Sequence, residues 1–319
     1  MPGFSDSTRI TVIGADGFIG RHLVQRLSML PETYVTAFDK YYSLDNFNSH
    51  PFHKLENVNL LAGDFLSRTD LVTAIKGSEY VFHLVSTTNP ATSNKDPLME
   101  IDTNIRGSVA LFGVCADLGV KRILFFSSGG TVYGNQEKVS IDELTLTKPQ
   151  SPYGIAKLTI EHYLRYYKAV SNLDYIVYRI ANPYGPGQPI NRKQGVIPIF
   201  MHNIIEGRPI SIYGNGEMVR DYIYIDDLIK MIADTFYRKT KYVIYNLGNG
   251  YGTSINELIR ALETCVNRKI QKNYLEVPDT FVQNSILNIE RFTNEFGLHP
   301  EISLIDGIRW TWENLVDSL

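Results

Sequence analysis

Tyr153 and Lys157 are the residues of this chain whose types and spacing most directly suggest chemistry. They are four residues apart, and on a helix this spacing puts both side chains on one face. An ammonium group beside a phenol lowers the pKa of the phenol, so Tyr153 could act as a general base near neutral pH. Such a pair is also common on ordinary protein surfaces, so its interpretation depends on the rest of the sequence.

Three glycines near the amino terminus support a catalytic interpretation. Gly14, Gly17 and Gly20 follow the apolar run 10–13 and lead directly into a helical pattern at 21–27. In a strand–turn–helix unit, the first glycine permits the tight turn, the second lets the backbone approach a pyrophosphate, and the third lets the helix pack on the strand. The helix amino terminus then directs free N–H groups at the phosphates. The pattern predicts dinucleotide binding, and a tight turn without a ligand is the alternative.

Asp39 ends the next β-rich run, 34–38, about twenty residues beyond the glycines. A carboxylate at this place accepts hydrogen bonds from the ribose hydroxyls and repels a 2′-phosphate. We therefore expect NAD rather than NADP. The alternative is a solvated carboxylate at a strand end.

Composition excludes several classes of protein. The 319 residues could form one large domain or two modest ones. With 31 basic and 34 acidic residues, the chain has no basic footprint, so we expect neither nucleic acid nor a membrane as a partner. Cys115 and Cys265 give no disulfide framework and no metal-ligand spacing, so we expect no metal. Residues 1–7 resemble no signal peptide, and no apolar run is long enough to span a membrane, which favours a cytoplasmic enzyme.

Short β-rich runs alternate with helical patterns at 57–62, 80–85, 122–126 and 175–180. This alternation predicts βαβ units and a parallel sheet, and therefore an α/β fold. Another helix should begin near Pro152. Apolar residues at three- and four-residue spacing also predict one long amphipathic helix, at Leu98, Ile101, Ile105, Val109 and Phe112.

The pattern changes after Ile180. The stretch 182–189 is rich in proline and glycine, and turns at 207, 214–216 and 248–250 separate shorter elements. We expect two domains, with the first formed by 1–180 together with 221–248 and the second by 181–220 and 249–319.

Taken together, the chain resembles the extended short-chain dehydrogenase/reductases of the NAD-dependent epimerase/dehydratase family, and within it the UDP-glucose and UDP-N-acetylglucosamine 4-epimerases. The resemblance covers nearly the whole chain. The segments that carry it are 14–20, 63–64, 82–84, 104–107, 127–134, 153–157, 179–187 and 220–227. It implies a Rossmann-type, doubly wound NAD-binding domain and a smaller mixed α/β domain that binds a UDP-hexose. It also implies a role in carbohydrate metabolism, with UDP-Glc/UDP-Gal and UDP-GlcNAc/UDP-GalNAc interconverted through a transient 4-keto sugar.

The resemblance implies a role for each matching residue. Tyr153 corresponds to the catalytic acid/base, and Lys157 also to the group that binds the nicotinamide ribose. The implied cofactor-binding residues are Gly14, Gly17, Phe18, Ile19, Gly20, Asp39, Asp64, Phe65, Leu84, Asn104, Ser127, Tyr153 and Lys157. The implied substrate-binding residues are Thr88, Ser128, Tyr153, Asn182, Gly195, Val196, Tyr213, Arg220 and Ser285.

Some of these roles are specific. Asp64 and Phe65 match the pair beside the adenine. Arg220 matches the arginine that grips the diphosphate, and its alternative is a salt bridge with Asp221 or Asp226. Asn182 matches the asparagine that reaches the diphosphate side of the substrate, and Tyr213 matches the aromatic residue that lies by the base. The resemblance also places Gly195 and Val196 in the loop that contacts the nucleotide. Ser285 is small where a tyrosine would exclude a 2-N-acetyl group, so we expect acetylated sugars to be accepted as well.

Two positions depart from the family pattern. Gly129 stands where many epimerases have their catalytic serine or threonine, so the hydroxyl must come from elsewhere. Ser128 is our first choice, with the extra freedom of two following glycines, and Thr131 is the second. A second phosphate-binding arginine is also missing from 277–281, so diphosphate binding would depend on Arg220 or Arg192.

Related enzymes of this family share the first chemical step of the epimerases, the oxidation at C4, but differ in the reaction that follows. A 4,6-dehydratase would carry an Asp-Glu pair where this chain has Gly130 and Thr131, which disfavours dehydration. A 4-keto-sugar reductase is the main alternative, and a non-catalytic NAD-sensing protein is the alternative from another class. The resemblance also implies a homodimer through the helix of Tyr153 and the preceding long helix. Tyr163, Leu164, Tyr166 and Tyr167 are a larger apolar and aromatic load than one helix face needs for its own core, and the alternative is that they line the packing of the domain itself.

Overall fold

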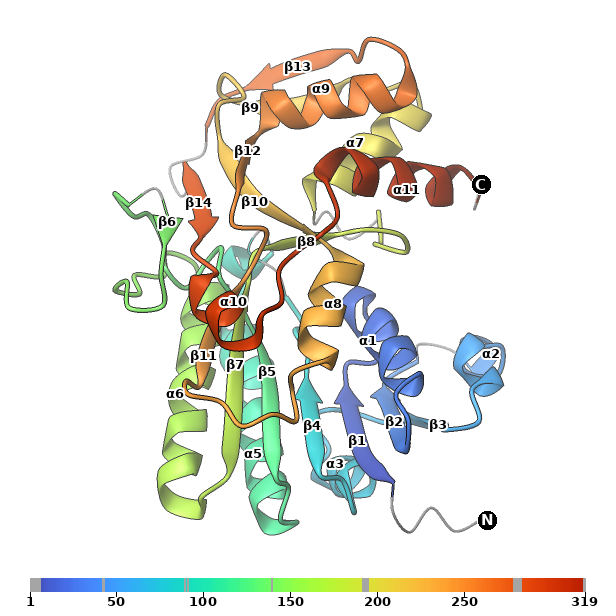
Figure 1. Cartoon of the computed structure of the whole chain (residues 1–319), viewed down its shortest axis with the longest axis vertical. Coiled ribbons are helices and arrows are strands. Elements are labelled where there is room, and N and C mark those ends of the chain that lie inside the picture. Colours follow the sequence, from blue (N-terminus) through green and yellow to red (C-terminus); the bar gives the residue numbers. More distant parts are fainter. Residues whose placement is uncertain are drawn as a thin grey trace. The chain divides into compact units, whose positions relative to one another are not determined.

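The computed structural model describes residues 7–41, 44–88, 90, 92–138, 140–190, 195–277 and 283–317. The chain forms two compact units, shown in Figure 1. Unit 1 consists of Met1–Ser127, Ile155–Tyr178 and Ile232–Ile244, and unit 2 of Ser128–Gly154, Arg179–Met231 and Tyr245–Leu319.

Unit 1 is built on a seven-stranded sheet with the order β11-β7-β5-β4-β1-β2-β3. The strands β1, β2, β3, β4 and β5 pair in parallel wherever they are neighbours. The order reverses direction at β1, which is the topology of a doubly wound Rossmann sheet and confirms the predicted fold class. The strands are β1 (Thr8–Ile13), β2 (Thr33–Asp39), β3 (Val58–Ala62), β4 (Tyr80–His83), β5 (Arg122–Ser128), β7 (Asp174–Ile180) and β11 (Ile244–Leu247).

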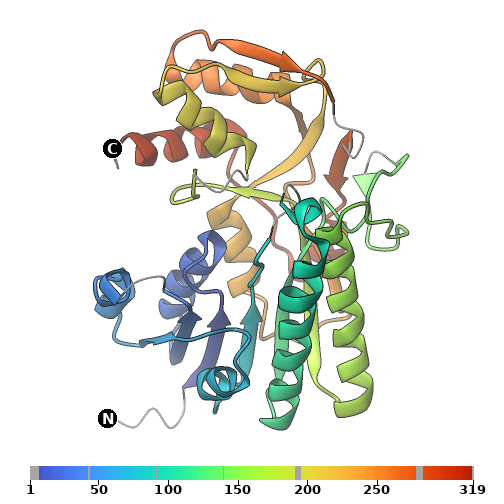
Figure 2. The ribbon, with the colours of Figure 1, turned by 180° about the vertical axis from the view of Figure 1, so that it is seen from behind.

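Helices cover both faces of this sheet. Figures 1 and 2 show α1 on one face and α3, α5 and α6 on the other. Because both faces are covered, the strands are nearly continuous apolar runs, and Phe112, Phe125 and Ile160 lie in the core between the sheet and its helices. The helices are α1 (Phe18–Ser28), α2 (Leu44–Asn48), α3 (Arg68–Ile75), α4 (Pro97–Met99), α5 (Arg106–Asp117) and α6 (Pro152–Ser171), with short 3₁₀ turns at Pro51–Lys54 and Ser93–Lys95.

A π-helical turn, Glu100–Ile105, interrupts the predicted amphipathic helix between α4 and α5. Phe112 is buried as predicted, but Leu98 is 68% exposed and Ile101 52% exposed, so the prediction was wrong for these two residues. A π turn holds more residues than an α turn. Leu98, before the turn, and Ile101, inside it, are therefore rotated away from the apolar stripe that α5 continues.

Unit 2 contains a five-stranded sheet and a separate pair, β9 and β13. The sheet follows the order β12-β10-β14-β6, and β8 also pairs with β10. The strands are β6 (Ser140–Ile141), β8 (Asn182–Tyr184), β9 (Ile210–Tyr213), β10 (Val219–Tyr224), β12 (Gly252–Ser254), β13 (Lys272–Leu275) and β14 (Asn284–Leu287). The helices are α7 (Val196–Ile205), α8 (Ile225–Ala233), α9 (Ile255–Val266), α10 (Glu290–Phe296) and α11 (Leu304–Asp317).

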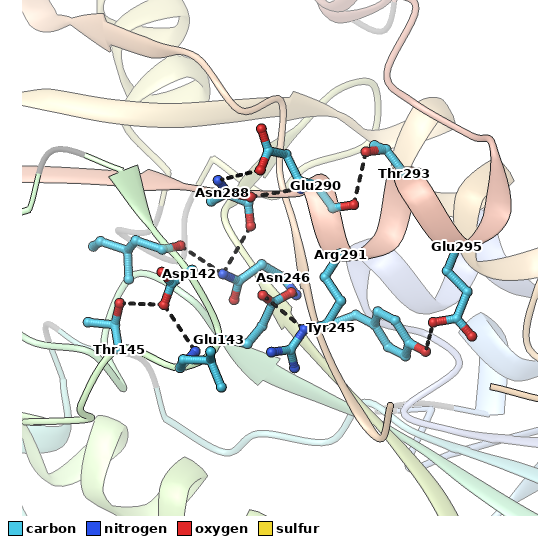
Figure 3. A network of polar contacts seen from close by, with 12 residues as sticks. Asp142, Glu143, Thr145, Tyr245, Asn246, Asn288, Glu290, Arg291, Thr293 and Glu295 are labelled. Carbon is cyan, nitrogen blue, oxygen red and sulfur yellow. Dashed lines mark hydrogen bonds and ion pairs between the residues drawn. The ribbon is translucent and has the colours of Figure 1, made fainter. Parts of the chain in front are cut away.

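A buried polar network explains why segment 128–154 belongs to unit 2, although the predicted bounds placed it in the first domain. The Glu143 carboxylate accepts a hydrogen bond from the Asn246 backbone N–H at 2.8 Å and pairs with Arg291 at 3.3 Å (Figure 3). The Tyr133 hydroxyl donates to Asn246 Oδ1 at 2.7 Å. Asn246 and Arg291 also belong to unit 2, so these contacts tie the segment to that unit. Which ligand each unit binds stays a prediction.

Candidate active site

The predicted glycine turn joins β1 to α1 in unit 1. Gly14 has a φ of 95°, and a Cβ there would lie 3.0 Å from the Val85 backbone nitrogen. A Cβ on Gly20 would lie 2.2 Å from the Gly14 carbonyl oxygen, so only glycine permits this close approach. In the described structure no side chain caps α1, whose N-cap is Gly17 and whose first residues are Phe18 and Ile19. The first-turn amides therefore suit a pyrophosphate, and the turn fits a dinucleotide.

Asp39 lies at the carboxyl end of β2, directly beside this turn. Its Oδ2 accepts a hydrogen bond from the Asp16 backbone N–H at 2.8 Å, and its Oδ1 accepts one from Lys40 N–H at 2.7 Å. Asp16 itself pairs with Arg21 at 2.6 Å and contacts His50 Nε2 at 3.1 Å. The ribose carboxylate that the sequence predicts is thus held in place by the glycine turn.

Asp64 and Leu84 also lie at the carboxyl ends of strands in unit 1. The Asp64 carboxylate accepts a hydrogen bond from Leu66 N–H at 2.9 Å and pairs with Lys40 at 3.3 Å. The Leu66 hydrogen bond is the main cause that lowers the pKa of Asp64, and Lys40 adds to it. The Leu84 N–H donates to the Ile13 carbonyl at 2.9 Å, which places Leu84 next to the glycine turn.

Phe65 has its ring in the core of unit 1. The ring stacks on His83 at a centroid distance of 5.3 Å, and a Cβ on Gly107 would lie 2.3 Å from it. The Phe65 ring is therefore already packed within the protein. If Phe65 contacts the adenine as predicted, the contact would come mainly from its backbone.

Lys157 is buried against β5, with 4% of its surface exposed. Its Nζ donates to the Phe126 carbonyl at 2.9 Å and lies 4.9 Å from the centroid of the Phe125 ring. Burial lowers the pKa of Lys157 to about 8. Tyr153 precedes it by four residues on the continuous helix α6. Ser127, a predicted cofactor residue, donates its hydroxyl to Glu161 Oε1 at 2.5 Å.

A buried acidic residue that the sequence analysis missed lies among the predicted ligand residues. Glu100 accepts hydrogen bonds from the Thr88 hydroxyl and from Asn104 Nδ2, the latter at 2.7 Å. In the sequence, Glu100 is marked only as a charged residue within an apolar helical pattern. Because such a residue usually faces solvent, the pattern did not indicate that Glu100 is buried.

The packing of the turn 128–134, in unit 2, shows why position 129 carries no side chain and therefore no hydroxyl. A Cβ on Gly129 would lie 2.5 Å from Leu287 Cδ1, so leucine occupies the space of a side chain. The Thr131 hydroxyl is buried and has no partner among the described residues. A Cβ on Gly154 would lie 2.8 Å from the Thr131 carbonyl, so the turn packs directly against the start of α6.

Asn182, Arg220 and Ser285 lie on adjacent strands of the unit 2 sheet. Arg220 is the register partner of Ser285, and Tyr222 that of Asn182. The Arg220 Nη1 donates to the Val219 carbonyl at 2.8 Å, and burial lowers the pKa of the guanidinium. Asn182 Nδ2 donates to the Asp221 carbonyl at 2.8 Å. The sheet brings these three predicted substrate residues together.

Asp221 is fully buried and accepts hydrogen bonds from backbone N–H groups. The donors are Asn249 at 2.7 Å, Gly250 at 3.2 Å and Leu287 at 3.3 Å. Burial raises the pKa of Asp221 to about 6. Consecutive strand residues point to opposite faces of a sheet, so the side chains of Arg220 and Asp221 point apart.

The remaining predicted substrate residues are spread over unit 2. Gly195, with a φ of 85°, is the N-cap of α7, and Val196 is the first residue of that helix. Tyr213 ends β9 and is 41% exposed. Arg192 and the segment 278–282 lie outside the described residues.

Comparison with known proteins identifies the family. Residues 10–248 match the NAD dependent epimerase/dehydratase family. A dTDP-4-dehydro-6-deoxyglucose reductase from Escherichia coli is 34% identical over 94% of this chain and 95% of its own. The solved UDP-glucose 4-epimerase of Thermotoga maritima, with UDP-glucose, is 32% identical with a TM-score of 0.89, over 98% of this chain and 99% of that one. The Thermus thermophilus UDP-glucose 4-epimerase, solved with NAD, is 26% identical with a TM-score of 0.88, over 98% and 100%.

The chain therefore belongs to the NAD-dependent epimerase/dehydratase family of short-chain dehydrogenase/reductases. It is an enzyme of the group that contains nucleotide-sugar 4-epimerases, dehydratases and reductases, and its cofactor is NAD. These findings confirm the predicted family and cofactor. In the described part of the chain, no helix has the length and apolarity to cross a membrane.

Proposed function

We propose that this protein is a nucleotide-sugar 4-epimerase that interconverts UDP-Glc with UDP-Gal and UDP-GlcNAc with UDP-GalNAc. The observation that carries the proposal is the Tyr153 and Lys157 pair on α6, with the lysine buried against β5. A buried ammonium group stabilises a phenolate more strongly than an exposed one, because water screens it less. The pair therefore suits proton removal from a sugar hydroxyl.

In this proposal Tyr153, as the phenolate, takes the proton from the sugar 4-OH, and Lys157 stabilises the negative charge before that transfer. Bound NAD supplies the hydride acceptor and donor. Tyr153 then returns its proton to the oxygen of the 4-keto sugar. If the bound NAD returned the hydride to the opposite face of the ring, C4 would be inverted without net oxidation.

Ser128 is our proposed source of the hydroxyl that orients the sugar oxygen. Thr131 is the competing candidate, and its buried hydroxyl supports it, because a polar atom without a partner gains most from a ligand hydrogen bond. For the diphosphate we propose Arg220, with Asn182 on the neighbouring strand. A guanidinium group suits phosphate oxygens. Gly195, Val196 and Tyr213 would hold the nucleotide.

The buried Ser285 supports acceptance of 2-acetamido sugars in this proposal. It is the register partner of Arg220, so the proposed sugar and diphosphate contacts lie on adjacent strands. Serine is much smaller than tyrosine and would leave space for an N-acetyl group.

The experiment is incubation of the purified protein with UDP-Glc, UDP-GlcNAc and dTDP-4-keto-6-deoxyglucose, with product stereochemistry read by NMR. We expect inversion at C4 of both UDP sugars without added cofactor. Absence of turnover with the UDP sugars, or a product not inverted at C4, would contradict the proposal. Absence of turnover with all three, with NAD retained, would favour the NAD-sensing alternative.

A 4-keto-sugar reductase is the second candidate, because of the 34% identity to the Escherichia coli reductase. A reductase consumes one reduced nicotinamide cofactor per sugar, whereas an epimerase consumes none. Stoichiometric loss of NADH or NADPH absorbance with the 4-keto sugar would establish this alternative. Asp39 beside the glycine turn argues against NADPH, because its carboxylate repels a 2′-phosphate.

We also propose a homodimer through α6 and the α4–α5 region. Apolar side chains exposed on these elements are Leu98, Met99, Ile101, Leu118, Ile155, Tyr163, Tyr166 and Val170. Leu164 lies in the core and the Tyr167 hydroxyl donates to the Val109 carbonyl, so these two belong to the fold of unit 1. Light scattering at micromolar concentration should give twice the chain mass, and a monomer mass would contradict the proposal.

A further inference from the structure

Tyr222 has a buried hydroxyl group that the protein itself does not satisfy. The residue lies in β10, two positions beyond Arg220, and 5% of its surface is exposed. Its hydroxyl oxygen is buried and has no hydrogen-bond partner among the residues that the structure describes. Buried tyrosine hydroxyls usually have a partner, so this one requires an explanation.

Packing within unit 2 holds the Tyr222 ring in place. The ring of Tyr184, on the neighbouring strand β8, meets it edge-on at a centroid distance of 6.4 Å. The strands β8 and β10 pair in parallel, with Tyr222 opposite Asn182. Because the strand and the aromatic neighbour fix the ring, the hydroxyl is presented in a defined place.

The strand register puts this hydroxyl on the face of the sheet that carries predicted substrate residues. Side chains alternate between the two faces of a strand, so Tyr222 and Arg220 point to one face and Asp221 to the other. Register partners on neighbouring strands share a face, which adds Asn182, the partner of Tyr222. One face of the sheet therefore carries a guanidinium group, an amide and the Tyr222 hydroxyl.

The Tyr222 hydroxyl is a hydrogen-bond donor. Burial raises the pKa of the phenol well above its usual value, although the positive charge of Arg220 acts in the opposite direction. The phenol therefore keeps its proton at physiological pH, and the Arg220 guanidinium remains a cation. A neutral donor and a cation on one face suit an anion that has several oxygens, and hydrogen bonds to such an anion are strong.

We propose that Tyr222 is a further binding residue for the diphosphate, and that its hydroxyl donates to a phosphate oxygen beside Arg220. The inference rests on the proposed function for the role of Arg220. The hydroxyl would add a diphosphate contact in a chain that has no arginine at 277–281. In the free protein the unpaired hydroxyl lowers stability, and the ligand supplies the missing acceptor.

The experiment is isothermal titration calorimetry of UDP with the full-length, NAD-loaded protein and with Tyr222→Phe, which removes only the hydroxyl. The Kd of the variant should rise by about 10–100-fold, the range for loss of a hydrogen bond to a charged group. The same change is expected with dTDP, which carries the same diphosphate. Uridine carries no phosphate and should bind both proteins equally.

Tyr245→Phe is the matched control, because it removes a buried tyrosine hydroxyl that has a protein partner. This hydroxyl donates to Glu295 Oε2 at 2.7 Å (Figure 3). Tyr245→Phe should bind UDP with the wild-type Kd but unfold at lower denaturant concentration. Tyr222→Phe, measured without UDP, should be at least as stable as the wild type, because it removes a donor that has no acceptor.

An unchanged Kd for UDP in Tyr222→Phe would overturn the inference, and so would an equal loss of affinity for uridine. Lower stability of Tyr222→Phe without UDP would show that the hydroxyl has a structural role and would also overturn it. A wild-type protein that binds neither UDP nor dTDP would do the same. Failure to convert UDP sugars, with the Tyr222 effect on UDP binding present, would contradict the proposed function alone.

Discussion

Gly129 and Leu287 form a pair whose coupling can be measured. A serine at position 129 would place its Cβ 2.5 Å from Leu287 Cδ1 and 3.0 Å from Cδ2. Leu287 is 1% exposed and has no solvent to move into. Overpacking of this kind typically costs about 1–3 kcal/mol, so Gly129→Ser should lower the free energy of unfolding by that amount. The φ of Gly129 is not positive, so its backbone does not itself oppose a side chain.

The second half of the pair is Leu287→Ala, which removes a buried leucine side chain. Such a change costs about 2–5 kcal/mol, depending on how far the surroundings collapse. In the double variant the serine occupies space that the leucine has left. The double variant should therefore lose less stability than the sum of the single variants, by about 0.5–3 kcal/mol.

Denaturant unfolding, followed by circular dichroism, gives the free energy of unfolding of the wild type, the two single variants and the double variant. Gly130→Ser is the matched control, because a Cβ at Gly130 would meet nothing within 4 Å. It should cost little stability, and its effect should add to that of Leu287→Ala. Wild-type stability of Gly129→Ser, or strict additivity in the Gly129 pair, would refute the view that Leu287 excludes a side chain from position 129.

Three further predictions concern the proposed chemistry. Tyr153→Phe should lower kcat by about 10²–10⁴-fold with unchanged NAD content, because the ring keeps its packing but loses the ionisable oxygen; a wild-type rate would contradict the mechanism. Ser128→Ala should lower kcat with little change in KM, whereas Thr131→Val should be mild, and steady-state kinetics showing the reverse would reassign the hydroxyl to Thr131. Ser285→Tyr should abolish turnover of UDP-GlcNAc while UDP-Glc remains a substrate, and equal loss on both sugars would speak against a role in sugar selection.

The sequence was sufficient for local features and insufficient for contacts between distant segments. The glycine turn and Asp39 could be predicted, because adjacent residues impose the strand, the turn and the helix. The Tyr153 and Lys157 spacing could be predicted for the same reason, since it depends on one helix. Assignment of their ligands and roles still depended on the resemblance to a family.

Contacts between distant segments explain what the sequence did not reveal. Nothing near Gly129 indicates that Leu287, on β14, fills the space of its side chain. Phe65 was predicted beside the adenine, but its ring packs on His83 and over Gly107. Glu100 was missed, because the helical pattern around it assumed a regular α-helix, whereas Glu100 begins a π-helical turn.

The π-helical turn also means that the number of residues between α4 and α5 determines how α4 is rotated relative to α5. Each residue of an α-helix turns the chain by about 100°, so deletion of one residue within 100–105 would rotate α4 by roughly that angle relative to α5. Leu98 and Ile101 would move toward the apolar stripe of α5, and the carboxylate at position 100 would move away from Asn104. Homologues with one residue fewer here should therefore place different side chains at both positions, and alignments of this segment should allow a one-residue gap.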